Sequence, residues 1–457
     1  MGHQLSCLFY LRLMNFKIKI YIINFLTLLI YSSFVLGFIF NENSIGSGDY
    51  GGDLQWMWIN FEIYKTNDLW TAIHHPDFFG NRTPLLYILH ILFNPFINNI
   101  DTYRFTVFCI SFIGPLIFYL CLKQRFKDID KFILFFISSF ILLSPYYRTS
   151  AYWGLEINYG IITMLLSIFF IDYALEKHKN NQPLTLSIIT LITFFSSLCL
   201  YFDQKLLIIP LIVLFQIFRS NIKIKFKILT LINYSFFAIP FLYLIFIWQG
   251  IAPPLTQAVN PEQGTHLTGL NNLHFFHIGY ASTIIAFYFL PIILLKKDNL
   301  VTIIKEFFKE NKNIYKILIV VFYIIFIIFY YDFENLTVTN PRYDYGLGIL
   351  HKISLIIFKD VFFREVFTYL SFVISWIIIL IAIEKRTINL VIIFYFYFLA
   401  LLLLPLMQEY FDPYIILFSF LLFNFKLNLN FKKTISLFLY LLIFLTSTNI
   451  YYFIKFS

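Results

Sequence analysis

Long apolar segments recur along the whole of this 457-residue chain, and they constrain its fold more than any other feature. A helix needs roughly 17 to 25 apolar residues to cross the hydrocarbon core of a bilayer. The sequence therefore predicts an all-α, polytopic integral membrane protein with about 13 transmembrane helices, forming one domain over 1–457. The predicted spans are 18–40, 104–122, 132–147, 157–175, 185–201, 206–218, 228–248, 276–295, 315–331, 366–383, 388–407, 413–424 and 434–454.

The composition of the chain supports this prediction. Hydrophobic residues make up 60% of the sequence and charged residues 13%, whereas a soluble domain has roughly 25% charged residues. Most of the surface must therefore face lipid. The net charge of +9 does not indicate a nucleic-acid partner, because the basic residues lie in short clusters between the spans.

The basic clusters also predict how the spans are oriented. They all fall on one side of the membrane if the spans alternate, and loops rich in Lys and Arg are typically cytoplasmic. We therefore expect a cytoplasmic N-terminus, an external C-terminus and a retained signal-anchor helix from about Ile18 to Phe40. The clusters are Arg12/Lys17/Lys19, Lys123/Arg125/Lys127, Lys177/Lys179, Arg219/Lys223/Lys225/Lys227, Lys296/Lys297/Lys305, Lys385/Arg386 and Lys426/Lys432/Lys433.

Three long loops then lie on the external side, at 41–103, 249–275 and 332–365. Most of the unusual polar residues of the chain fall in these loops or at the outer ends of the spans. Ionisable groups in such positions are expensive to bury in lipid, so they are functional candidates. The sequence thus predicts a multi-pass protein of the plasma (inner) membrane with its active site on the extracytoplasmic face.

The first external loop opens with two carboxylates in a glycine-rich run, Asp49 and Asp53. Asp53 precedes an aromatic segment that we expect to be helical. It is either a helix N-cap that accepts a backbone N–H or a general base close to the membrane surface. Asp49 is the competing candidate for the base, and its alternative role is that of a turn aspartate.

Two motifs in this loop resemble the GT-C superfamily of membrane glycosyltransferases, which use polyprenyl-phosphate sugars and include protein mannosyltransferases and lipid A aminoarabinose transferases. The motifs are Asp53-Leu54-Gln55-Trp56 and Arg82-Thr83-Pro84-Leu85-Leu86-Tyr87. The resemblance implies that Asp53 is the catalytic base. It also implies two amphipathic helices in the first loop, for which Leu54–Tyr64 and Pro84–Phe93 are the matching segments.

Further acidic and aromatic residues are candidates for binding the acceptor or the sugar. Glu156 resembles an acidic residue that the family places at the outer start of span four, and an ion pair with Arg148 is its alternative role. Glu409 and Asp412 either help to bind a sugar or cap span twelve. Trp56 either stacks on a sugar or belongs to an interfacial aromatic belt.

Cations in the third external loop are candidates for binding the donor phosphate. Arg342, His351 and Lys352 lie there, and fixed positive charge, above all the fork of an arginine, suits a phosphate group. Binding of phospholipid headgroups is the alternative, because it uses the same chemistry. Asp203 and Lys205 in another outer turn are expected to form a surface ion pair.

The sequence contains no ligand spacing that is typical of a metal site, so no cofactor is assigned and a divalent metal has no support. The four cysteines lie in or near predicted spans and indicate no disulfide framework.

These features favour an inverting glycosyltransferase of the hexosyltransferase type. Its predicted partners are a polyprenyl-phosphate sugar donor, the lipid bilayer, and a glycan, lipid or protein acceptor outside the cytoplasm. An O-antigen or polysaccharide polymerase or ligase is the first alternative. A non-enzymatic lipid or polysaccharide flippase is the second, although paired halves with charges inside the spans would be expected of it.

Overall fold

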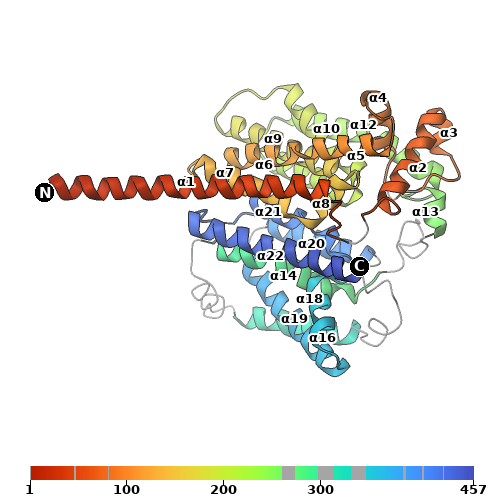
Figure 1. Ribbon diagram of the computed structural model, residues 1–457. Coiled ribbons are helices and arrows are strands. Elements are labelled where there is room, and N and C mark those ends of the chain that lie inside the picture. The colour runs from red at the N-terminus through yellow and green to blue at the C-terminus, as the bar shows by residue number, and fades with distance from the viewer. Residues whose placement is uncertain are drawn as a thin grey trace.

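A computed structural model shows the chain as a bundle of α-helices (Figure 1). The structure describes residues 2–45, 48–80, 82–259, 273–296, 313–330, 346–383, 387–403, 406–425 and 427–456. These ranges contain no β-strand, and an isolated bridge joins Lys296 to Leu427. The predicted all-helical class is therefore confirmed.

The helices differ widely in length, from single turns to the 38 residues of α1. In chain order they are α1 (Gly2–Ile39), α2 (Asp53–Thr66), α3 (Leu69–Ile73), α4 (Leu85–Phe93), α5 (Ile100–Ser111), α6 (Ile113–Arg125), α7 (Lys131–Ser138), η1 (Ser139–Leu143), α8 (Pro145–Tyr152), α9 (Ile157–Lys179), α10 (Leu186–Phe202), η2 (Gln204–Leu206), α11 (Ile208–Arg219), α12 (Ile224–Trp248), α13 (Pro254–Val259), α14 (His277–Leu294), α16 (Asn313–Tyr330), α18 (Gly348–Ile357), α19 (Val361–Ala382), α20 (Thr387–Leu402), η5 (Gln408–Tyr410), α21 (Tyr414–Leu421) and α22 (Phe431–Phe456).

Seven of the described helices are long and apolar enough to cross a membrane, and a bent pair of helices raises the number to eight. The expectation of a polytopic helical membrane protein is confirmed at this level. The other predicted spans correspond to shorter helices. For example, α21 has 8 residues, which extend over only about 12 Å at the helical rise per residue. The count of 13 spans therefore stays a prediction.

The predicted span at 132–147 is broken in the structure. Its first part ends at Leu143, and α8 starts at Pro145 after a bend of 68°. Proline cannot continue a helix but is well tolerated at the first helical position. The Ser144 side chain caps the new helix by accepting the N–H of Tyr147 at 2.9 Å. All eight residues of α8 are buried, so the break places this helix inside the bundle.

The helices of the first long loop gather at the end of the bundle where α1 ends, as Figure 1 shows. The segments predicted at Leu54–Tyr64 and Pro84–Phe93 are present as α2 and α4. Asn60 of α2 joins them, because its amide donates to the Tyr87 hydroxyl at 2.9 Å and accepts the N–H of Phe79 at 3.1 Å. The loop is therefore a packed structure rather than an irregular connection.

Contacts between helix ends bring several basic clusters together. Lys127, just after α6, forms an ion pair with Glu176 near the end of α9. Arg125 donates to the carbonyl oxygen of Phe423 at 2.8 Å. The basic ends of α6 and α9 and the segment after α21 thus lie side by side, as expected if they share one face of the membrane.

Reporter fusions check the predicted orientation. A reporter placed after Lys127, Lys179 or Lys227 should have a cytoplasmic location, and one placed within 255–270 or 340–355 should be external, because the basic clusters stay inside. The measurement is the ratio of a periplasm-active to a cytoplasm-active reporter at each fusion point. A cytoplasmic reading from 340–355 contradicts the predicted span order.

Candidate functional site

A cavity of about 720 Å³ lies where the first long loop meets the rest of the bundle. Its wall is built by α2, the segment before α4, the starts of α8 and α9, η5, α18 and the C-terminal half of α22. A volume of this size is within the roughly 300–1,000 Å³ that is typical of small-molecule sites. We therefore take this cavity as the candidate functional site.

Six residues that the sequence predicts as site residues line this cavity, although they come from distant parts of the chain. They are Asp53, Trp56, Glu156, Lys352, Glu409 and Asp412. Asp49 and His351 do not line the cavity, and Arg342 lies outside the described residues. The structure brings the six together, while their chemical roles stay predictions.

Asp53 is the first residue of α2 and faces the cavity. The N-cap of this helix is Gly52, and no side chain caps the helix. The interpretation of Asp53 as an N-cap is therefore wrong. Asp49 is exposed in the preceding turn, where its carbonyl oxygen accepts the N–H of Gly52 at 3.4 Å. Trp56 lies one turn after Asp53, half-exposed at the cavity wall.

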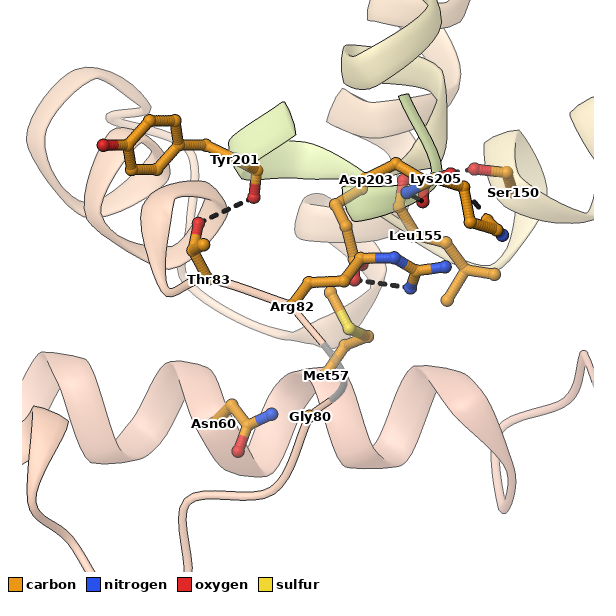
Figure 2. Close-up of polar contacts among 12 residues, drawn as sticks. Met57, Asn60, Gly80, Arg82, Thr83, Ser150, Leu155, Tyr201, Asp203 and Lys205 are labelled. Atoms are coloured by element: carbon orange, nitrogen blue, oxygen red, sulfur yellow. Dashed lines mark hydrogen bonds and ion pairs between the residues drawn. The ribbon is translucent and has the colours of Figure 1, made fainter. Parts of the chain in front are cut away.

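The segment before α4 is held against two other parts of the molecule. The Thr83 hydroxyl donates to the carbonyl oxygen of Tyr201 at 2.6 Å, at the end of α10. The N–H of Gly80 donates to the Thr256 hydroxyl at 2.8 Å. These bonds position Arg82, which extends toward Asp203 and Lys205 in Figure 2. Arg82 lines the cavity but was not among the predicted site residues. Its position in the second of the two motifs that resemble GT-C enzymes could have identified it.

Arg82, whose side chain is 21% exposed, forms an ion pair with the buried Glu156, with 2.6 Å between Nη1 and Oε1. Gly154 lies between α8 and α9, and its φ of +72° is a left-handed backbone conformation that favours glycine. The turn at Gly154 lets the chain place Glu156 directly before α9. Burial would lower the pKa of Arg82, but the negative charge of Glu156 raises this pKa well above its ordinary value. Arg82 is therefore a permanent cation beside the carboxylate.

Arg148 does not pair with Glu156, so the predicted ion pair between these two residues is wrong. Glu156 does form an ion pair, but its partner is Arg82. Arg148 is 2% exposed and donates to Glu42 from Nε at 2.8 Å and from Nη2 at 2.5 Å. It also donates to the carbonyl oxygens of Ser33 and Leu142 at 2.8 and 3.1 Å. Arg148 therefore joins α8 to α1 and to the start of the first loop.

The pair formed by Asp203 and Lys205 is present, with 3.5 Å between Oδ2 and Nζ. The expectation that it lies on the surface is wrong, because the side chains of Lys205 and Asp203 are only 11% and 2% exposed. Both lie near Arg82 in Figure 2. The Tyr414 hydroxyl donates to Asp203 at 2.6 Å, and the Lys205 ammonium lies 4.8 Å from the ring centroid of Tyr410. Burial lowers the pKa of Lys205, and the charge of Asp203 opposes this shift.

Glu409 on η5 is half-buried in the cavity wall. Burial, helped by the negative charge of Asp53, raises the pKa of Glu409 to about 7. The positive charges of Lys205 and Arg82 oppose the shift. The charge of Asp53 therefore influences the protonation of Glu409, and a carboxyl group with a raised pKa in a cavity is typical of functional sites.

Glu409→Gln is expected to stabilise the protein above neutral pH. Glu409 has a folded-state pKa of about 7 against an ordinary value of 4.5, so the stability it contributes is full below pH 4.5 and is lost as pH rises to about 7. A glutamine removes this loss, which is at most on the order of 3 kcal/mol at about 1.36 kcal/mol for each pKa unit. The measurement is thermal unfolding between pH 5 and 8. An equal slope in both proteins contradicts the shifted pKa.

Asp412 holds the N-terminus of α8. Its Oδ2 accepts the Ser144 hydroxyl at 2.6 Å and the N–H of Tyr146 at 3.3 Å. A carboxylate is favourable there because helix N-termini carry unpaired N–H groups and partial positive charge. The suggestion that Asp412 caps span twelve is wrong, since α21 begins after Pro413 without a side-chain cap. Its more immediate role is to position one cavity wall.

Lys352 and His351 are neighbours on α18 and point in different directions. The Lys352 ammonium donates to the Tyr452 hydroxyl at 2.5 Å and lies 5.1 Å from the ring centroid of Tyr451, at the cavity. His351 is buried against the ring of Tyr280. Burial lowers the pKa of His351 to about 4, and the charge of Lys352 adds to this shift. His351 is therefore neutral at pH 7 and supplies no positive charge.

Within the described ranges, no group of three or more His, Cys, Asp or Glu side chains is arranged to hold a metal ion. Cys109, Cys121 and Cys199 are free thiols.

No protein-family model matches the chain, and no curated protein is significantly similar to it in sequence. The resemblance to GT-C enzymes therefore stays a prediction that rests on the two short motifs of the first loop.

Proposed function

We propose that this protein is an inverting, GT-C-like glycosyltransferase that moves a sugar from a polyprenyl-phosphate donor to an acceptor hydroxyl. The proposal includes about 13 spans in the plasma (inner) membrane, with the cavity on the extracytoplasmic face. One observation carries it: a single cavity is lined by carboxylates, by the cations Arg82 and Lys352 and by apolar side chains.

Asp53 is the proposed general base. It would accept the proton of the acceptor hydroxyl while the oxygen attacks the anomeric carbon from the face opposite the phosphate, which inverts the configuration. The bond between the anomeric carbon and the phosphate oxygen breaks in the same step. Trp56 lies close enough on the same helix to offer its ring to the sugar.

The part of the cavity wall that α18 forms suits a lipid phosphate. Lys352 supplies positive charge for the departing phosphate, which is an efficient form of transition-state stabilisation. Ile353, Ile356 and Phe444 line the same cavity, and Ile356 is exposed. These apolar side chains would contact a polyprenyl chain entering from the bilayer. Arg342 would add a second cation.

Replacement of Lys352 tests the proposal. Lys352→Ala should lower transfer by about 10²–10³-fold, as expected for loss of one electrostatic stabiliser, and Lys352→Arg should keep part of the activity because it keeps the charge. The assay is transfer of labelled hexose from a synthetic polyprenyl phosphate to extracted cell-envelope glycans and lipids, with purified protein in nanodiscs.

Lys359→Ala is the matched control, because Lys359 is an exposed lysine just beyond α18. It should transfer sugar at the rate of the natural protein. Equal activity of Lys352→Ala and Lys359→Ala contradicts the role of Lys352. Absence of transfer by the natural protein contradicts the proposed function itself.

A further inference from the structure

The last turns of helix α22 form part of the cavity wall. The cavity-lining residues of this helix recur with the spacing i, i+3, i+4, i+7 and i+8, which places them on one face of the helix. They are Phe444, Ser447, Thr448, Tyr451 and Tyr452. The site therefore includes one face of α22 in addition to the first loop and α18.

Hydrogen bonds fix the rotation of α22 about its own axis. The Asn449 amide donates to Oε1 of Glu42 at 3.2 Å, and its oxygen accepts the Ser44 hydroxyl at 3.0 Å. Further along the helix, the Tyr440 hydroxyl donates to the carbonyl oxygen of Phe287 at 2.8 Å. These bonds join α22 to the start of the first loop and to α14, so the cavity-lining face of the helix is held in place.

Lys352 of α18 contacts this face. Its ammonium donates to the Tyr452 hydroxyl at 2.5 Å and lies 4.7 and 5.1 Å from the ring centroids of Tyr452 and Tyr451. Arg82 and Lys205, by contrast, each lie against a carboxylate. Aromatic rings attract a cation, and a lysine side chain that nothing holds has high rotamer entropy. The two tyrosines therefore restrict the ammonium to one part of the cavity.

Lys352 has a competing partner in the same cavity. Burial raises the pKa of Glu409, and the charge of Lys352 is one of those that oppose this rise. An ammonium without the Tyr452 hydroxyl would be drawn toward this carboxylate, because opposite charges attract. The tyrosines therefore decide how much of the positive charge is presented to a bound anion.

We propose that Tyr452 is a positioning residue, whose hydroxyl and ring, together with the ring of Tyr451, hold the Lys352 ammonium where it contacts the phosphate of a bound lipid phosphate. This inference rests on the proposed function for the identity of the anion. It adds a residue of α22 that acts on the lipid phosphate only through Lys352.

A double-mutant cycle tests the inference by binding, without requiring transfer. The probe is a short polyprenyl phosphate without a sugar, titrated by calorimetry into purified protein in nanodiscs, and the matching polyprenol is the uncharged reference. Tyr452→Phe keeps the ring and removes the hydroxyl. Affinity for the polyprenyl phosphate should fall about tenfold, because one hydrogen bond to a charged group orients the ammonium. In the Lys352→Ala background, the same substitution should change this affinity less than about twofold, because the group that Tyr452 holds is absent.

Tyr440→Phe is the matched control. Tyr440 lies on the same helix and its hydroxyl also makes a hydrogen bond, but it does not line the cavity. This variant should lower the temperature of unfolding without changing the affinity for the polyprenyl phosphate. An equal loss of affinity in Tyr440→Phe and Tyr452→Phe reveals a general effect on the fold and overturns the inference.

Tyr451→Leu keeps the inference testable if Tyr452→Phe does not fold. The variant removes the second ring beside the ammonium, so affinity for the polyprenyl phosphate should fall about two- to fivefold. This loss should again occur only in proteins that retain Lys352. An equal loss with and without Lys352 contradicts the inference.

The outcomes separate this inference from the proposed function. Transfer of hexose by the natural protein, with an affinity for polyprenyl phosphate that Tyr452→Phe leaves unchanged or lowers equally with and without Lys352, contradicts only the inference. A loss of affinity that depends on Lys352, in a protein that transfers no hexose, contradicts only the proposed glycosyltransferase activity. Equal binding of the polyprenol and the polyprenyl phosphate by the natural protein shows that the lipid chain alone is bound, which overturns the inference.

Discussion

Asp53→Asn should fold and insert normally, yet transfer sugar about 10²–10⁴-fold more slowly than the natural protein, as is typical when a general base is removed. The amide has nearly the same size as the carboxylate but cannot accept the acceptor's proton. The helix cap is not affected, because Gly52 occupies that position. Loss of the negative charge in the first turn should reduce stability by only about 0.3–1 kcal/mol. The measurement is the transfer assay described above, with thermal unfolding recorded in parallel.

Asp49→Asn is the matched control, since Asp49 is exposed outside the cavity. It should have close to normal activity. An inactive Asp49→Asn beside an active Asp53→Asn identifies Asp49 as the base. Full activity of both variants contradicts the proposed mechanism and favours a polymerase, ligase or flippase, in which neither aspartate is expected to matter.

Arg148→Met should lower the free energy of unfolding by about 3–5 kcal/mol, the range for removing one partner of a buried ion pair. Arg148 is 2% exposed and makes charge-assisted bonds to Glu42. Without the guanidinium, Glu42 is left as a charge without its partner, and the carbonyl oxygens of Ser33 and Leu142 each lose a donor. The measurement is the denaturation midpoint of the purified protein in detergent.

A double variant shows whether the effect comes from the unpaired charge. Arg148→Met combined with Glu42→Met should recover a substantial part of the lost stability, because replacing both members of a buried pair by apolar residues is often nearly neutral. Glu62→Gln serves as a surface control, since Glu62 pairs with Lys65 in solvent. A loss below about 1 kcal/mol in Arg148→Met, the level of a surface pair, contradicts the structural role of Arg148.

Local patterns in the sequence were sufficient to predict the helices and much of the cavity lining. Apolar length and the spacing of basic clusters are properties of short windows, so they predicted a polytopic helical protein. The resemblance of two short motifs to a known family implied helices at Leu54–Tyr64 and Pro84–Phe93, which the structure contains. Ionisable groups at span ends are expensive to place in lipid, and this rule together with the family resemblance indicated Glu156 and Glu409.

The pairing of charges depended on the tertiary structure. Glu156 pairs with Arg82 and Arg148 pairs with Glu42, because the packing of the first loop against α8 and α9 decides which groups meet. Adjacent residues differ by about 100° around a helix, so only the packing of α18 shows that Lys352 faces the cavity.

Burial was the other property that only the packed chain could decide. Asp203 and Lys205 have the sequence of a solvated surface pair, yet α10, η2 and α21 enclose them. Asp412 stands before one helix in sequence but binds the N-terminus of another, α8. Hydropathy and local spacing contain no information about which distant element covers a side chain. That information comes only from the close packing of the helices, which determines the charge and the hydrogen-bond partners of each group in the cavity.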